Sequence, residues 1–316
     1  MNIIIVGAGM AGLLVARMLK LRGHSVTVLE KQKELPNNHN SVLRFRSNVV
    51  CDITGIPFKK VQMVKGTVPY LNPVAEALAY SYKTTGTYST DRSITQGLTI
   101  ADRWIAPPDF IKQLAAGVDI KFNCAFEPLV DSTYSVPCIS TILMPALLDA
   151  IDYPHVVNFS KFKSKAGSVL RGNIENCNAY ASLYVPDPGY AFYRISITGD
   201  EFICEFPNDG DLSGAGEQLA IDLFSEQAMM LLGFKFDKNR IIKMNFIKQP
   251  YAKIEHIDER DRKQFLSYAT DNFNIYSLGR YATWRPGLLL DDLVKDVKLI
   301  EGWIMGNNNY DVRRNR

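Results

Sequence analysis

Residues 3–12 read Ile-Ile-Ile-Val-Gly-Ala-Gly-Met-Ala-Gly, and this stretch decides the fold of the first part of the chain. Its β-branched opening predicts a strand that is buried on both faces of a parallel sheet. Gly7, Gly9 and Gly12 follow in the spacing GxGxxG, and apolar side chains at helical spacing come next. The stretch therefore predicts a strand, a glycine-rich turn and a helix.

Each of these glycines has a physical reason to lack a side chain. Gly7 permits a tight turn, Gly9 lets the backbone approach a pyrophosphate, and Gly12 allows the helix to pack closely on the strand. The first helical turn would offer free backbone N–H groups and a partial positive charge to the phosphates. The predicted phosphate-binding residues are Gly7, Ala8, Gly9, Met10, Ala11 and Gly12.

A second predicted strand, residues 25–29, ends at Glu30, which lies 18 residues beyond Gly12. A carboxylate at this point is suited to accept hydrogen bonds from ribose hydroxyls, with Lys31 beside it. Strand, glycines, helix, second strand and terminal acid together predict a dinucleotide-binding βαβ unit. The alternative is a glycine turn in an ordinary α/β sheet.

The opening stretch resembles the FAD-binding N-terminus of the glutathione-reductase-like flavoproteins, especially the amine oxidase, protoporphyrinogen oxidase and UDP-galactopyranose mutase group. Residues 117–145 look like the β-meander of that family, and residues 273–280 like its late strand, which runs into a Gly-Arg turn. The resemblance implies FAD as the cofactor. It also implies an α/β fold: a Rossmann-type FAD-binding domain with a parallel sheet and β-meander, plus a second, mostly antiparallel α+β substrate domain.

The domain boundaries follow from the composition of the chain. The FAD-binding domain is expected to be discontinuous, comprising residues 1–52, 98–152 and 258–316. The substrate or cap domain is expected to comprise residues 53–97 and 153–257. Alternating apolar runs separated by turn signals predict the antiparallel sheet of this second domain, and a helix near residues 216–232 interrupts it.

The resemblance also implies contacts at the flavin end of the cofactor. Gly279 and Arg280 would lie along the ribityl chain, and a helix beginning at Leu288 and Leu289 would point its N-terminus at the flavin pyrimidine ring. A positive helix end there would stabilise the anionic reduced flavin. Arg280 stands where many family members have Asp, as in the Gly-Arg version of the mutases.

Arg44 and Arg46 occupy the region where family members bring an arginine toward the FAD phosphates. One reading assigns this contact to Arg44 or Arg46. The other places both charges on the exposed face of a strand, with Leu43 and Phe45 pointing inward at period two.

The second domain carries the candidate substrate contacts. Tyr184 and Tyr193 are candidate walls of a flat substrate site, and cross-strand packing is the alternative. Arg194 is either a solvated strand residue or an anchor for a substrate anion. The late turn adds Trp284 and Arg285, whose alternative is a surface loop anchored by the tryptophan.

Lys253 is the candidate catalytic residue, together with Arg280. A lysine where the chain leaves the sheet could hold a water near flavin N5, as lysines do in amine oxidases, and an exposed strand lysine is the alternative. Flavin enzymes need few protein acids or bases, because the cofactor accepts the hydride.

The composition of the chain bears on its binding partners, metal content and cellular compartment. A net charge of +3 is too small to indicate nucleic acid or an anionic membrane, and the five cysteines form no CxxC pair, so a metal site is not expected. Reduced cysteines and the absence of an apolar run of about 20 residues or a signal peptide predict a cytoplasmic protein without membrane contact.

Several functions remain open from the sequence. The first is hydride abstraction from an amine-bearing carbon of a small-molecule substrate held between the flavin and the antiparallel sheet. The second is a redox-neutral mutase that acts on a nucleotide sugar through reduced flavin. A non-catalytic FAD-binding module and oxidation of an amine carried on nucleic acid are further alternatives, and the oligomeric state is left open.

Overall fold

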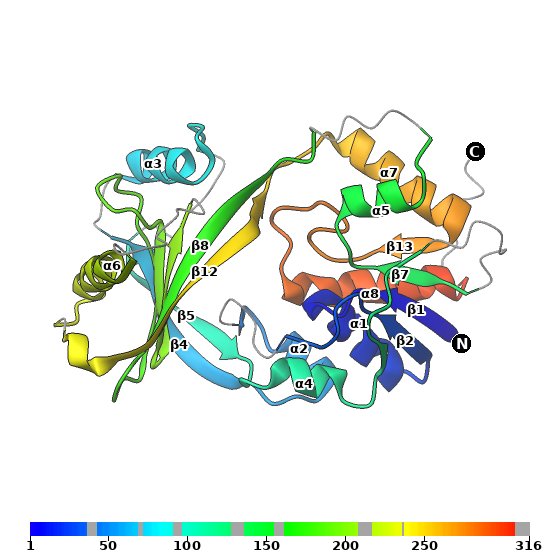
Figure 1. Cartoon of the computed structure of the whole chain (residues 1–316), viewed down its shortest axis with the longest axis horizontal. Coiled ribbons are helices and arrows are strands. Elements are labelled where there is room, and N and C mark those ends of the chain that lie inside the picture. The colour runs from blue at the N-terminus through cyan, green and yellow to red at the C-terminus, as the bar shows by residue number, and fades with distance from the viewer. Residues whose placement is uncertain are drawn as a thin grey trace. The chain divides into compact units, whose positions relative to one another are not determined.

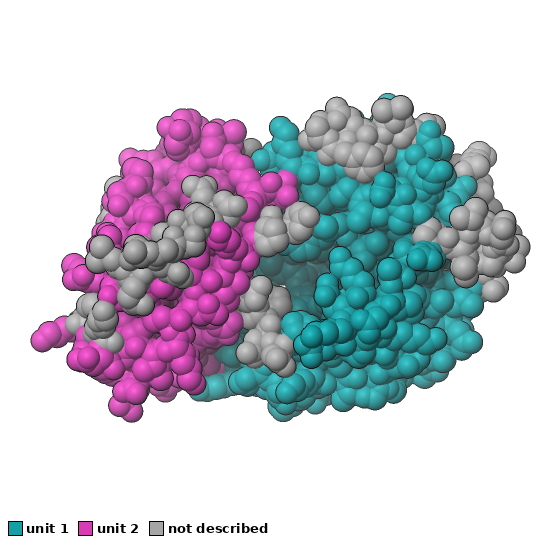
Figure 2. Space-filling model, in the orientation of Figure 1, with its two compact units in different colours: residues 1–59, 104–163, 254–316 teal, residues 60–103, 164–253 magenta. Residues whose placement is uncertain are grey.

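The computed structural model describes residues 1–36, 43–68, 72–90, 97–127, 136–154, 161–207, 217–235 and 237–306. The chain forms two compact units, coloured in Figure 2. Unit 1 comprises Met1–Lys59, Trp104–Lys163 and Ile254–Arg316, and unit 2 comprises Lys60–Arg103 and Ser164–Lys253. The sequence-based boundaries at residues 52, 97, 152 and 257 correspond to 59, 103, 163 and 253 here.

Unit 1 is built on a five-stranded sheet with the order β13-β7-β1-β2-β6. Every pairing in this sheet is parallel. Its strands are β1 (Asn2–Val6), β2 (Ser25–Leu29), β6 (Asp119–Lys121), β7 (Cys138–Ser140) and β13 (Ile275–Ser277). Its helices are α1 (Met10–Leu21), α2 (Val49–Thr54), α4 (Phe110–Ala115), α5 (Met144–Ala150), α7 (Glu259–Phe273) and α8 (Leu290–Ile304).

Strand β1 shows why this sheet is covered on both faces. Ile3 and Ile5 belong to a core formed with α1, α4 and α8, whereas Ile4 and Val6 pack into a core formed with α5 and α7. Successive side chains of a strand point to opposite faces, so an uninterrupted apolar run needs two apolar layers. Figure 1 shows α5 and α7 on one side of β7 and β13, with α1 and α8 on the other.

Unit 2 contains most of a mixed eight-stranded sheet with the order β12-β8-β11-β10-β9-β4-β5-β3. The pairings among β8, β9, β10 and β11 are antiparallel, and β4 pairs with β9 in parallel. The strands are β3 (Arg44–Phe45), β4 (Lys59–Thr67), β5 (Thr99–Ile105), β8 (Ser164–Ile174), β9 (Ala179–Tyr184), β10 (Arg194–Gly199), β11 (Glu201–Phe206) and β12 (Ile241–Ile254). Helix α6 (Glu217–Leu231) packs on one face, and α3 (Pro73–Thr85) contributes Tyr80 to a tyrosine cluster with β9.

Several elements differ from the sequence-based expectation. Helix α7 was not predicted because only two of its side chains, Phe265 and Ala269, are buried, which leaves a weak apolar stripe. The sequence predicts a strand over residues 190–198, whereas residues 190–193 are irregular and β10 begins at Arg194. Of the expected β-meander at residues 117–145, residues 128–135 lie outside the described residues, and the described strands β6 and β7 pair in parallel with β2 and β1. Within the described ranges, no helix is long and apolar enough to cross a membrane, and no acidic, cysteine and histidine cluster could hold a metal ion.

Candidate cofactor and substrate site

The carboxyl ends of the parallel strands bring four segments to one edge of the unit 1 sheet. The glycine turn follows β1, Glu30 follows β2, Thr141 follows β7, and Gly279 lies just beyond β13. From β1 the chain moves to β2 on one side, while β7 and β13 lie on the other side. Ligands of open parallel sheets bind at such a reversal of strand order. This edge is therefore the candidate site.

The glycine turn has the shape that a pyrophosphate requires. A Cβ atom on Gly12 would lie 1.9 Å from the Gly7 carbonyl oxygen, so helix and turn can pack this closely only without a side chain there. A Cβ atom on Gly9 would meet nothing within 4 Å, so the space outside the turn is open. No side chain caps the N-terminus of α1, and its first turn has no acidic residue. The free N–H groups therefore remain available to a phosphate.

Glu30 is fixed by two backbone hydrogen bonds. The Ala8 N–H donates to its Oε2 (2.7 Å) and the Gln32 N–H donates to its Oε1 (2.8 Å). A carboxylate has about four acceptor positions, so each oxygen retains one for a ribose hydroxyl. Lys31, the neighbour in the predicted contact set, is exposed.

Thr141 and Gly279 support the glycine turn from the β7 and β13 side. The Thr141 hydroxyl donates to the Val6 carbonyl oxygen (2.8 Å), and its Oγ1 would lie 2.7 Å from a Cβ on Gly7. Gly279 has φ +100°, and a Cβ on it would lie 3.1 Å from the Ala11 Cβ in the first turn of α1. The predicted residue Arg280 therefore follows directly beside the phosphate-binding turn. Its Nε is buried and has no hydrogen-bond partner within the described part of the chain.

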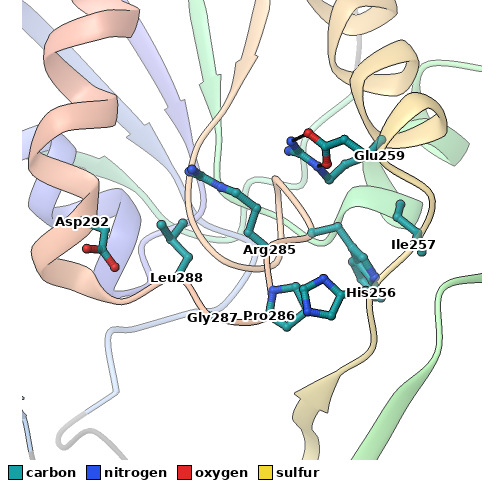
Figure 3. A pocket seen from close by; sticks show the side chains of 10 residues that line it. His256, Ile257, Glu259, Arg285, Pro286, Gly287, Leu288 and Asp292 are labelled. Atoms are coloured by element: carbon teal, nitrogen blue, oxygen red, sulfur yellow. Dashed lines mark hydrogen bonds and ion pairs between the residues drawn. The ribbon is translucent and has the colours of Figure 1, made fainter. Parts of the chain in front are cut away.

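A pocket of about 430 Å³ lies in unit 1 beyond this turn (Figure 3). This volume is in the range of small-molecule sites. Its wall combines the loop after β13, the start of α8 and the segment that leads into α7. The lining residues are His256, Ile257, Glu259, Arg262, Trp284, Arg285, Pro286, Gly287, Leu288 and Asp292.

The loop at the back of this pocket is held in one shape. Trp284 has φ +48°, a backbone conformation that bulky residues rarely adopt. Its indole N–H donates to the Glu255 carbonyl oxygen (2.9 Å), and its side chain is buried against Phe162. Such strain persists only where the surroundings enforce it. The predicted substrate residue Trp284 thus anchors the loop as well as lining the pocket.

Two arginines of the pocket bind Thr283, the residue next to Trp284. Arg262 donates to the Thr283 carbonyl oxygen (3.2 Å) and forms a two-bond ion pair with Glu259, drawn with dashed lines in Figure 3. Arg285 donates to the Thr283 hydroxyl (3.1 Å) and pairs with Asp296. Both guanidinium groups are therefore charge-compensated.

The start of α8 carries two acidic residues, and Arg46 binds both. The Arg46 backbone N–H donates to Asp291 Oδ2 (2.7 Å), and its Nη2 donates to Asp292 Oδ1 (2.6 Å). Burial lowers the pKa of Arg46, but the hydrogen bond to Asp292 and the charges of both carboxylates outweigh this, so the pKa lies above its usual value. The predicted contact Leu289 precedes α8 and donates its N–H to Asp292 Oδ2 (2.9 Å).

Arg44 lies on β3, where it pairs with Ile105 of β5. Its side chain is half-buried, unlike that of Arg46, which is exposed. Phe45 between them is buried in the unit 1 core and contacts Phe58 and Phe110. The inward position of Phe45 agrees with the period-two pattern.

In unit 2, the Lys253 side chain lies among tyrosines. Its Nζ is 3.8 Å from the ring centroid of Tyr193 and 5.7 Å from that of Tyr80, both within the range of a cation–π contact. Tyr80 also packs edge-on against Tyr184 (5.2 Å between centroids). The Lys253 ammonium group therefore occupies the aromatic cluster that was predicted to bind substrate.

Arg194 is bound to Glu205 on the neighbouring strand, directly opposite it in the register. The Arg194 Nη2 donates to Glu205 Oε1 (2.6 Å), and the Tyr193 hydroxyl lies 3.4 Å from the same oxygen. Burial, followed by the charge of Glu205, raises the pKa of Tyr193 well above its usual value. The positive charge of Arg194 is thus compensated within unit 2.

The geometry agrees with comparisons to known proteins. A family model described as FAD dependent oxidoreductase matches residues 2–106. The fold is similar to that of reduced UDP-galactopyranose mutase, with a TM-score of 0.67, 12% identity, and 98% of this chain and 95% of that chain covered. No curated protein matches the chain.

Two further solved structures share the fold. An oxidoreductase from Methanosarcina mazei has a TM-score of 0.59 at 10% identity, covering 95% of this chain and all (100%) of the other. A p-nitrophenol 4-monooxygenase from Pseudomonas putida has a TM-score of 0.58 at 13% identity, covering 98% and 82%. At these identities the likeness shows the fold alone.

The family match, the open glycine turn and the fixed Glu30 together identify FAD as the cofactor. The chain is a flavoprotein, and its residues 2–106 match the family model of FAD-dependent oxidoreductases. Sequence reasoning did not select Thr141, His256, Arg262 or Asp292 for the site. Thr141 lies in the stretch that resembles the β-meander, but no local motif marks the other three, which reach the pocket only through the packing of the chain around α7 and α8.

Proposed function

We propose that this protein oxidises a small polar substrate at an amine-bearing carbon, with the substrate in the pocket beside the α8 N-terminus. One observation carries the proposal. The residues suited to adenosine and pyrophosphate lie in order along one sheet edge, and that edge continues, through Gly279 and Arg280, toward the pocket of about 430 Å³.

The residues that would hold FAD follow this order. Glu30 would accept bonds from the ribose, residues 7–12 would bind the pyrophosphate, and Gly279 and Arg280 would adjoin the ribityl chain. Leu288 and Leu289 would lie at the flavin end. The buried Arg280 Nε supplies a hydrogen-bond donor that the protein itself leaves unused in the described ranges.

When bound, FAD supplies a hydride acceptor. The protein's own side chains would bind and orient the substrate. Glu259 and Asp292, although both are in ion pairs, keep lone pairs on their carboxylate oxygens that can accept hydrogen bonds from an ammonium group, and His256 supplies an imidazole that can act as the base. Trp284 provides an apolar surface that excludes water from one side.

Anaerobic mixing of the purified yellow protein with a panel of primary and secondary amines tests the proposal. We expect at least one amine to bleach the flavin absorbance, and His256→Asn to slow that bleaching while FAD stays bound. His24→Asn is the matched control, because His24 contacts Glu301 near the opposite end of α8. Bleaching by no amine, or equal rates in the two variants, would contradict the proposal.

A second candidate is a redox-neutral mutase acting on a nucleotide sugar. Arg280 favours it, because a guanidinium group beside the glycine turn suits an anionic diphosphate. The same protein, reduced chemically and incubated with nucleotide sugars, would then interconvert sugar isomers without net flavin oxidation. Product analysis by chromatography separates this outcome from amine oxidation.

Among the residues of unit 2, Lys253 is the one proposed to act directly in the reaction. We propose that its ammonium group, held by the Tyr193 and Tyr80 rings, supports the reaction electrostatically and through a positioned water. Tyr184, Tyr193 and Arg194 are proposed to act by holding this lysine and the sheet beneath it.

A further inference from the structure

The proposed flavin end of unit 1 carries several charges close together at the start of α8. A helix N-terminus carries about half a positive charge, which favours an anionic ligand. The first turn of α8, however, holds two carboxylates, Asp291 and Asp292, whose formal charge of −2 exceeds that of the helix end. Without compensation, this end of the pocket would repel an anion.

Arg46 provides the compensation from a distant part of the sequence. Its backbone N–H and side chain together make three contacts: two to Asp291 Oδ2, at 2.7 and 3.4 Å, and one to Asp292 Oδ1, at 2.6 Å. The Asp291 side chain is only 9% exposed, so its charge acts through a medium that water screens weakly. One guanidinium group therefore bridges both acidic residues.

Asp292 links Arg46 to the pocket, because it both contacts Arg46 and lines the pocket. Its Oδ2 accepts the Leu289 N–H at 2.9 Å, which fixes the carboxylate at the helix end, and Asp292 itself lines the pocket beside Leu288. The other charged groups that line the pocket, Arg262, Glu259 and Arg285, are already in ion pairs. Arg46 therefore determines how much of the negative charge of Asp292 acts on the pocket.

We propose that Arg46 tunes the reduction potential of the bound flavin by partly neutralising the acidic first turn of α8. Taking up two electrons and one proton adds one negative charge to the flavin ring system. Compensation by Arg46 lowers the electrostatic cost of that charge and so raises the potential. Arg46 would act through Asp291 and Asp292, as a positioning residue. The inference rests on the proposed location of the flavin ring at this pocket.

The midpoint potential of the FAD-loaded protein, measured by equilibration with a reference dye, tests the inference. Arg46→Gln should favour oxidised over reduced FAD about tenfold, which for a two-electron couple lowers the potential by about 30 mV. Arg22→Gln is the matched control, because Arg22 pairs with Glu301 near the other end of the same helix, roughly 15 Å away at 1.5 Å per residue. Its potential should move much less.

Two more variants separate charge from structure. Arg46→Lys should retain most of the wild-type potential, and Asp292→Asn should raise the potential both alone and in the Arg46→Gln background. Equal potentials for Arg46→Gln and Arg22→Gln, or a potential unchanged by Asp292→Asn, would overturn the inference. If Arg46→Gln fails to retain FAD, the midpoint potential of Asp292→Asn alone tests the inference. A wild-type protein whose FAD does not respond to any amine or nucleotide sugar would instead contradict the proposed function while leaving the potential measurable.

Discussion

The phosphate-binding edge of unit 1 and the tyrosine–lysine cluster of unit 2 (Lys253, Tyr80, Tyr184 and Tyr193) represent two ways of building a site. At the edge, glycines keep side chains away from the backbone N–H groups proposed to bind the ligand, and most of the residues involved lie within residues 7–30. In the cluster, side chains from α3, β9, β12 and the residue before β10 meet across long stretches of sequence. The first kind of site can be read from a short motif, and the second cannot.

The two regions should also respond differently to mutation. Side chains added at the edge should remove the cofactor, either by disrupting packing or by filling the space of the phosphates. Side chains removed from unit 2 should leave the cofactor bound and weaken local packing. Each variant below tests this contrast, and the expected effects decrease in order.

Gly12→Ala should have the largest effect. Its methyl group would lie 1.9 Å from the Gly7 carbonyl oxygen, and neither backbone segment can move without separating α1 from β1. We expect a loss of about 3 kcal/mol or more in the free energy of unfolding, and no bound FAD. Urea denaturation and flavin absorbance of the purified protein measure both.

Gly9→Ala is the comparison variant, because a Cβ there meets nothing within 4 Å and φ is −70°. The apoprotein should keep its stability to within about 1 kcal/mol. Its FAD affinity should fall at least about tenfold, since the methyl group enters the space of the pyrophosphate. If both variants destabilised the apoprotein equally, the separation of packing and binding roles within the turn would be wrong.

Arg194→Met should have the next largest effect, and in unit 2. It leaves Glu205, whose side chain is 14% exposed, without its guanidinium partner. We expect a destabilisation of about 2 kcal/mol, reduced from the cost of a fully buried pair because the Arg194 side chain is partly exposed. FAD content should not change.

Lys60→Met is the control for this variant. Lys60 pairs with Asp102 at 2.7 Å, but both side chains are well exposed, so the change should cost less than about 1 kcal/mol. Urea denaturation of both proteins gives the comparison. Loss of FAD in Arg194→Met would show that unit 2 controls cofactor binding and would break the contrast between the two regions.

The same contrast explains how far sequence reasoning could reach. The strand, glycine turn, helix and terminal acid of residues 3–30 were predictable, because each follows from local periodicity or from a glycine that only one geometry requires. The pairing of Arg46 with Asp291 and Asp292 was not, since about 245 residues separate the partners. The lysine at position 253 was selected by its place in the chain, yet its tyrosine surroundings follow only from the folded sheet.

Lys253→Met tests whether a lysine held between these tyrosines contributes to the reaction. Loss of the cation–π contacts with Tyr193 and Tyr80 should cost about 1 kcal/mol of stability. FAD should stay bound, and flavin reduction by the substrate should slow. Lys253→Arg, which retains the charge, should recover part of the rate. Stopped-flow rates equal to those of the wild type in Lys253→Met would remove Lys253 from the mechanism.

The smallest expected effect is a pH dependence of stability that originates at Lys83. Its Nζ donates to the carbonyl oxygens of Val185 (2.9 Å) and Asp187 (2.6 Å), which ties α3 to the turn after β9. Burial lowers the pKa of Lys83 to about 8, and the charge of Asp187 offsets part of this shift. In the unfolded chain the pKa returns to its ordinary value of about 10.4.

Between these two values the unfolded state binds more protons than the folded state, so the free energy of unfolding should rise with pH above about 8. Below pH 8 both states are protonated, and the full cost of burying the charge is present. The buried Cys138 thiol, whose pKa burial raises to about 12, has the opposite effect above pH 9. The measurement is therefore the difference between wild type and Lys83→Met in urea denaturation at pH 7.5 and 9.0. That difference should shift in favour of the wild type as pH rises, because Cys138 contributes equally to both proteins. A difference that is constant with pH would mean that Lys83 keeps an ordinary pKa and that its site is more open to water than its two carbonyl contacts indicate.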